Sequence, residues 1–185
     1  MKLLLKNGRL IEPVSRRDEV TDFLINDGII ERIGSGLNVQ GAQVIELRGK
    51  VVAPGFLDMH VHLRQPGFEY RETILTGCTA AAAGGFTGIC CMPNTNPPID
   101  DESVIKLIQD EARKALDGLV DVYPLAAVTV GRKGEHIAPI AELASAGAVG
   151  FTDDGDPVAD AEIMRRALEY ASMFRRPVVQ PSPPR

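Results

Sequence analysis

From residue 51 onward the sequence alternates between short apolar runs and amphipathic stretches, a pattern that few folds can accommodate. The apolar runs are typical of buried strands, and the stretches between them have the spacing of helices. Strands and helices that alternate in this way predict parallel βα units. The predicted strands cover residues 51–63, 86–92, 120–130, 148–152 and 177–180.

Local signals place the four intervening helices. An Ala-rich helix over residues 71–83 ends at Gly84-Gly85, and a second helix is capped by Asp101. Residues 137–146 form a third helix. Asp156 as N-cap and Pro157 as first residue open a fourth helix, which extends to about residue 174. The second helix carries the stripe expected of a helix packed on a sheet, at Val104, Ile108, Ala112 and Leu116.

Two closed architectures fit parallel βα units, a doubly wound sheet and an eight-fold barrel. No GxGxxG motif follows the first of these strands, which disfavours the nucleotide-binding version of the doubly wound sheet. Polar residues suited to catalysis instead follow several different strands, where (β/α)8 barrels place their active sites. We therefore predict an α/β fold, the N-terminal half of a (β/α)8 barrel over residues 54–185.

Residues 1–53 have a different pattern of short strands separated by Gly, Asn and Asp turns. The clearest signal is Asn26-Asp27-Gly28 between two apolar runs, which predicts a β-hairpin. We expect a small β-rich, sandwich-like domain here.

Charge and hydropathy exclude several functions. The net charge is −5, which argues against a surface for nucleic acid or anionic membranes. The most apolar window, residues 78–92, is shorter than the ~18–20 residues of a spanning helix, and the apolar run near Met1 is too short for a signal peptide. We expect a cytoplasmic protein.

The three cysteines of the chain have no paired spacing and are interpreted as buried small hydrophobes.

Two of the three histidines, His60 and His62, lie two residues apart at the end of a predicted strand. Alternate strand residues share a face, so Asp58 and Arg64 are expected on the same side. Imidazoles about 7 Å apart along a strand can converge on one cation if the strand end curls, and zinc suits such ligands. The sequence therefore predicts a metal site at this strand end. His136 is interpreted as structural or exposed.

A metal held by two histidines needs a further ligand. Asp153 and Asp154 close the fourth barrel strand; alone, Asp-Asp-Gly is a common turn, but beside a histidine pair one carboxylate is expected to reach the ion. Only one of the two needs to face inward, and Asp153 is preferred. Asn94, after the second strand, is expected to bind a substrate carboxylate together with the planar guanidinium of Arg64.

The segment from Ala53 to Gly67, with Asp58-Met59-His60-Val61-His62 at its centre, resembles the signature of the amidohydrolase superfamily. More narrowly, the chain resembles bacterial type I dihydroorotases over about residues 1–180. Three further segments carry this resemblance: Glu72-Thr73 with the Ala-rich helix, Cys91-Met92-Pro93-Asn94-Thr95, and Phe151-Thr152-Asp153-Asp154-Gly155.

The resemblance implies a zinc-dependent hydrolase that interconverts dihydroorotate and N-carbamoyl-L-aspartate in pyrimidine biosynthesis. One or two zinc ions would be held by His60, His62 and a shared Asp153, and Arg64 with Asn94 would hold the substrate carboxylate. No lysine follows Lys133, which favours this family over hydantoinases and allantoinases, whose sites use a carboxylated lysine.

The resemblance ends near Gln180. Relatives continue with a histidine ligand, whereas Pro181 stands here, and no residue matches their proton-transfer aspartate, so the catalytic base is unassigned. We expect a truncated chain, with residues 181–185 as an out-of-frame tail. Two alternatives to a dihydroorotase are open: an inactive structural partner of aspartate carbamoyltransferase, and a cyclic amidase of the hydantoinase or allantoinase type. Besides the small-molecule substrate, the partner expected from the resemblance is a second copy of the chain or aspartate carbamoyltransferase.

Overall fold

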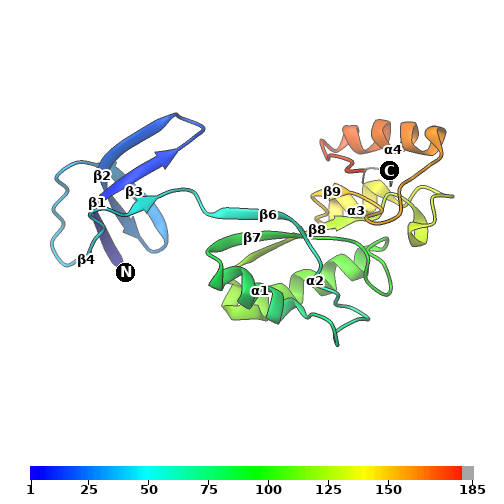
Figure 1. The fold of residues 1–185 in the computed structure, drawn as a ribbon, viewed down its shortest axis with the longest axis horizontal. Coiled ribbons are helices and arrows are strands. Elements are labelled where there is room, and N and C mark those ends of the chain that lie inside the picture. Colours follow the sequence, from blue (N-terminus) through cyan, green and yellow to red (C-terminus); the bar gives the residue numbers. More distant parts are fainter. Residues whose placement is uncertain (181–185) are drawn as a thin grey trace. The chain divides into compact units, whose positions relative to one another are not determined.

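A computed structural model describes residues 1–180, and the chain divides after Pro54 into two compact units (Figure 1). The division lies next to the predicted boundary at residue 53. The proposed out-of-frame tail, residues 181–185, lies outside the described residues.

The first unit is a single mixed sheet. Its strands run in the order β3-β2-β1-β4, with β5 also paired to β1. The predicted hairpin is present: β2 and β3 are antiparallel, and Asp27 and Gly28 in the turn both have positive φ, as a tight hairpin turn requires. The strands are β1 (Lys2–Glu12), β2 (Arg17–Asn26), β3 (Ile29–Gly34), β4 (Gln43–Glu46) and β5 (Val51–Val52).

The second unit has a four-stranded parallel sheet whose spatial order, β6-β7-β8-β9, follows the chain. A doubly wound sheet would reverse its order at a switch point, so the sheet has the topology of part of a barrel. The predicted fold class is confirmed. The strands are β6 (Phe56–Val61), β7 (Phe86–Cys91), β8 (Asp121–Ala126) and β9 (Gly150–Phe151).

Four helices connect these strands or follow them, and the first two lie along one side of the sheet (Figure 1). In α2, the predicted residues Val104, Ile108 and Ala112 are buried, whereas Leu116 falls beyond the helix and is half-buried. The helices are α1 (Ile74–Ala83), α2 (Glu102–Lys114), α3 (Ile140–Ala146) and α4 (Ala161–Met173); short 3-10 turns are η1 (Ala115–Gly118) and η2 (Val130–Arg132).

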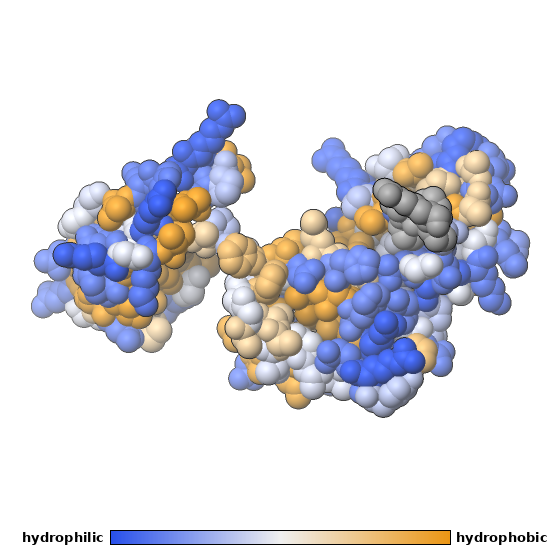
Figure 2. Space-filling model, in the orientation of Figure 1, coloured by the Kyte–Doolittle hydropathy of each residue, from blue (hydrophilic) through white to orange (hydrophobic). Residues whose placement is uncertain are grey.

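The main core of this unit lies between the sheet and its helices. Phe151, in β9, is fully buried in it together with Ile105 and Leu143 from the helices. On β6, by contrast, Phe56, Leu57 and Met59 are exposed, and Figure 2 shows apolar surface over this part of the unit. The three cysteines are buried, as predicted, and burial raises the pKa of Cys91 to about 12.

Several predicted elements differ in extent; the strand predicted over residues 120–130, for example, ends at Ala126. Residues 51–63 form two strands, β5 and β6, because Ala53-Pro54-Gly55 interrupts the pairing and proline lacks an N–H. The prediction of Asp156 as a helix cap was wrong: Asp160 caps α4 by accepting from the Glu162 and Ile163 amides. Residues 177–180 form only a parallel bridge, between Val178 and Phe151.

Within the described part of the chain, every helix is too short or too polar to cross a membrane.

Candidate metal centre

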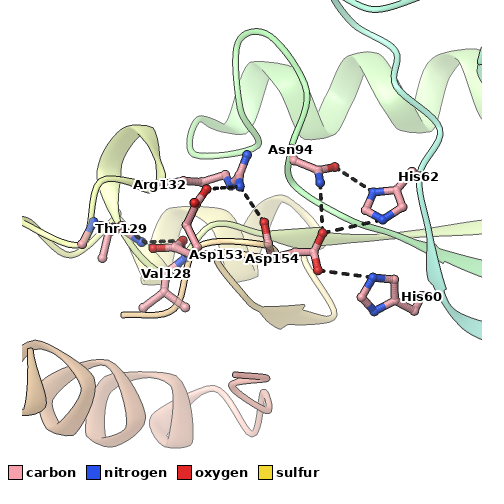
Figure 3. Close-up of polar contacts among 10 residues, drawn as sticks. His60, His62, Asn94, Val128, Thr129, Arg132, Asp153 and Asp154 are labelled. Atoms are coloured by element: carbon pink, nitrogen blue, oxygen red, sulfur yellow. Dashed lines mark hydrogen bonds and ion pairs between the residues drawn. The ribbon is translucent and has the colours of Figure 1, made fainter. Parts of the chain in front are cut away.

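Polar side chains meet at the carboxyl ends of β6, β7 and β9 (Figure 3). His60 and His62 come from the end of β6, Asn94 follows β7, and Asp154 follows β9. Parallel strands end at one edge of a sheet, so residues separated by up to 94 positions in sequence are adjacent here. Asp154 lies between the two histidines on one side and Arg132 on the other (Figure 3).

The Asp154 carboxylate is oriented toward both imidazoles. Its Oδ1 is 3.2 Å from His60 Nε2, and its Oδ2 is 3.7 Å from His62 Nε2. One ligand atom from each of the three residues lies within 4.8 Å of the others. Asp154 is only 8% exposed, whereas His60 is open to solvent, so the cluster has a buried floor and an accessible side.

This spacing fits a divalent metal ion. Nitrogen and oxygen ligands about 2.0–2.1 Å from a tetrahedral ion lie about 3.3 Å apart, close to the two distances above. Two imidazoles and one carboxylate also form a donor set that borderline divalent ions prefer. The three residues can therefore hold a metal with small side-chain adjustments.

Asn94 forms hydrogen bonds with both a histidine and the aspartate of the cluster. Its Nδ2 donates to Asp154 Oδ2 at 2.9 Å, and its Oδ1 is 2.9 Å from His62 Nδ1. A carboxylate only accepts hydrogen bonds, so the amide nitrogen must face Asp154 and the amide oxygen must face His62. Nδ1 of His62 therefore carries the proton, and Nε2 keeps the lone pair that a metal requires. The predicted substrate contact of Asn94 stays a prediction.

The structure places Asp154, where we predicted Asp153, beside the histidines. Asp153 is 1% exposed and points away, accepting from the amides of Val128 and Thr129 at 2.8 and 3.1 Å and from the Thr129 hydroxyl. A turn closed by the Asp156 amide and the Asp153 carbonyl directs Asp154 back toward β6. Asp153 therefore anchors the loop after β8 to the loop after β9.

The predicted common face of residues 58, 60, 62 and 64 is only partly present. The pairing of β6 with β7 shifts register between Asp58 and Val61, and Asp58 accepts from the His60 amide instead of facing the histidines. A bulge of this kind breaks strict alternation. Arg64 is half-buried, and its guanidinium makes no hydrogen bond or ion pair with residues 1–180, so it is available to a ligand. His136 is exposed.

Arg132, in η2 after β8, was missed by the sequence analysis. Its guanidinium donates to the backbone carbonyl of Asp154. The rule that barrel sites collect residues from strand ends also applies to Gly131-Arg132-Lys133, and it would have drawn attention to this arginine.

Burial raises the pKa of the Asp153 carboxyl above its ordinary value, against the opposing effect of its hydrogen bonds to Thr129 and Val128. The folded protein then binds this proton more tightly than the unfolded chain. The group's stabilising contribution is complete below the unfolded pKa and is lost as the pH rises through the folded pKa. Urea denaturation at several pH values should show wild type losing stability relative to Asp153→Asn above about pH 4. A constant difference would contradict this.

Comparison with known sequences gives consistent matches. The sequence model of the dihydro-orotase-like family matches residues 49–181. A dihydroorotase of Pelotomaculum thermopropionicum is 51% identical over 97% of this chain, and one of Geobacter sulfurreducens is 50% identical over 92%. The matches cover 41% and 40% of those relatives, so the chain spans about two fifths of their length.

Solved structures share the fold. L-hydantoinase (dihydropyrimidinase) from Arthrobacter aurescens matches with a TM-score of 0.77 and 24% identity, covering 95% of this chain and 39% of that one. A D-hydantoinase matches with a TM-score of 0.75 and 25% identity, covering 96% and 39% of the two chains. A dihydroorotase structure matches with a TM-score of 0.60 and 14% identity, covering 96% and 50%.

Proposed function

Because this chain belongs to the dihydroorotase-like family, we propose that it forms part of a metal-dependent cyclic amidase. The reaction is the interconversion of dihydroorotate and N-carbamoyl-L-aspartate in pyrimidine biosynthesis. The observation that carries the proposal is the cluster of His60, His62 and Asp154 at one edge of a parallel sheet.

Zinc is the proposed ion. Two neutral imidazoles and a carboxylate are among the usual ligand sets of catalytic zinc sites, which keep one position open for water or substrate. When bound, such an ion supplies Lewis acidity and lowers the pKa of a water molecule toward neutrality. The accessible side of the cluster, at His60, leaves room for a substrate to approach.

The remaining residues bind the substrate or orient the metal ligands. Arg64, whose guanidinium makes no polar contact with residues 1–180, is suited to the exocyclic carboxylate of dihydroorotate, which matches its planar fork. Asn94 keeps the proton of His62 on Nδ1 and holds the Asp154 carboxylate in place. Asp154 forms the buried floor of the site, and His60 lines its accessible side.

Hydrolysis of another cyclic amide is the second candidate, because the hydantoinase structures match with the higher TM-scores. Two features of this chain favour dihydroorotate. Arg64 offers a positive charge to a carboxylate that dihydrouracil lacks, and the loop after β9 carries Asp153 and Asp154, with no lysine among residues 134–180. Association with a second copy or with aspartate carbamoyltransferase stays a prediction from the sequence resemblance.

The function can be tested on this chain alone and on a chimera that joins residues 1–180 to the C-terminal remainder of the Pelotomaculum relative. We expect the zinc-loaded chimera to hydrolyse dihydroorotate and to lose activity when His60 and His62 are replaced by alanine. Arg165→Gln, on an exposed face of α4, is the matched control and should retain activity. A chimera that folds and binds zinc but prefers dihydrouracil would contradict the proposed substrate.

Arg64→Gln in the chimera should raise KM for dihydroorotate about 10- to 100-fold, since a charge-assisted hydrogen bond contributes about 1.5–3 kcal/mol. The KM for dihydrouracil, whose ring carries no carboxylate, should change far less. Steady-state kinetics on both compounds makes the comparison. Equal losses on the two substrates would remove Arg64 from the carboxylate subsite.

A further inference from the structure

Arg132 lies in the loop after β8, and its side chain extends to the loop after β9. Its backbone lies in the left-handed region, with φ of 58°, and its side chain is 17% exposed. The guanidinium reaches the turn that carries Asp154 (Figure 3). The arginine is therefore hydrogen-bonded to the backbone of the metal-facing residue, and its hydrogen bonds within residues 1–180 include neither histidine.

One guanidinium nitrogen makes both contacts with this turn. Nη2 donates to the Asp154 carbonyl oxygen at 2.5 Å and to Asp156 Oδ2 at 2.6 Å. The two acceptors lie on opposite sides of Gly155, whose φ of +86° produces the sharp turn. Arg132 thus bridges the two ends of the turn.

Asp154 is consequently held at three points. Its carboxylate accepts from Asn94, its carbonyl accepts from Arg132, and its neighbour Asp153 is anchored by Val128 and Thr129. Arg132 and the Asp153 anchor both come from the chain segment after β8. That segment therefore determines where the backbone of Asp154 lies, and Asn94 determines how its side chain is turned.

We propose that Arg132 is a positioning residue, which holds the Asp153–Asp156 turn so that the Asp154 carboxylate stays directed at His60 and His62. The proposal rests on the proposed function, because it requires that His60, His62 and Asp154 bind a metal. Outer contacts that orient metal ligands contribute 10- to 100-fold to affinity in known sites. A side chain that only stabilised the fold would leave the affinity of the folded protein unchanged.

The test titrates the metal-free chain with Co²⁺ and follows the visible absorption of the bound ion. Arg132→Gln removes the charge and should weaken Co²⁺ binding about 10- to 100-fold. Arg132→Lys should recover most of that loss, because a single nitrogen makes both contacts. Arg165→Gln removes an exposed, ion-paired arginine of α4 and should bind Co²⁺ like wild type.

Hydrogen exchange on the metal-free protein gives a second readout that needs no ion. The Asp156 amide donates to the Asp153 carbonyl at 2.9 Å, and Arg132→Gln should speed its exchange. Unchanged Co²⁺ affinity in a folded Arg132→Gln protein, or an equal loss in Arg132→Lys, would overturn the proposal. If wild type binds no Co²⁺, the metal function fails, and unchanged exchange at Asp156 would then overturn the role of Arg132 as well.

Discussion

Asp154→Asn is expected to weaken Zn²⁺ or Co²⁺ binding by more than about 100-fold. Loss of an outer contact to a metal ligand costs 10- to 100-fold in affinity, so loss of the ligand's charge should exceed that range. The geometry supports a large effect, because the Asp154 carboxylate is the acidic group directed at both His60 and His62. Isothermal titration of the metal-free protein measures the change.

Asp153→Asn is the matched control, since it makes the same chemical change one residue earlier. Asp153 contacts Val128 and Thr129 instead of the histidines, so its substitution should reduce metal affinity by about tenfold or less. The reverse result, with Asp153→Asn losing more affinity than Asp154→Asn, would restore the sequence prediction. It would also show that the turn rearranges when a metal binds.

Phe151→Ala is expected to lower the free energy of unfolding of the second unit by about 3–5 kcal/mol. Phe151 is fully buried in the main core, and its backbone pairs with residues 177–179 on one side and β8 on the other. Removing the ring leaves a cavity in the main core, at the strand that leads into the turn with Asp153 and Asp154. Such a loss is a large share of the 5–15 kcal/mol typical of a whole domain.

Phe56→Ala provides the control at an exposed phenylalanine, where the side chain is 60% accessible. Its effect should stay within about 0.5 kcal/mol, as for most surface substitutions. Phe151→Leu should fall between the two, at about 1–2 kcal/mol, because fewer buried carbons are removed. Urea denaturation monitored by circular dichroism gives all three values. A loss below about 1 kcal/mol in Phe151→Ala would contradict the close packing of Phe151 in the main core.

The sequence predicted the second unit well because its signals are local. Apolar runs and the apolar stripe of α2 indicate which side chains are buried. This pattern can be recognised within a window of a few residues. The hairpin at Asn26-Asp27-Gly28 is local in the same sense, since its turn residues tolerate positive φ. The errors at Asp156 and at residues 51–63 arose where a polar side chain found a distant partner or a proline interrupted pairing.

The same distinction between local and long-range information applies to the site. The sequence by itself determined the family and the presence of two histidines and an aspartate pair at strand ends. Only the tertiary structure decided that Asp154 is the carboxylate beside His60 and His62, that Asn94 lies between ligands, and that Arg132 belongs to the site. These choices depend on a bulge in β6 and on turns that bring together loops 22 to 94 residues apart. Periodicity carries no information about such contacts, because it describes one strand or helix at a time.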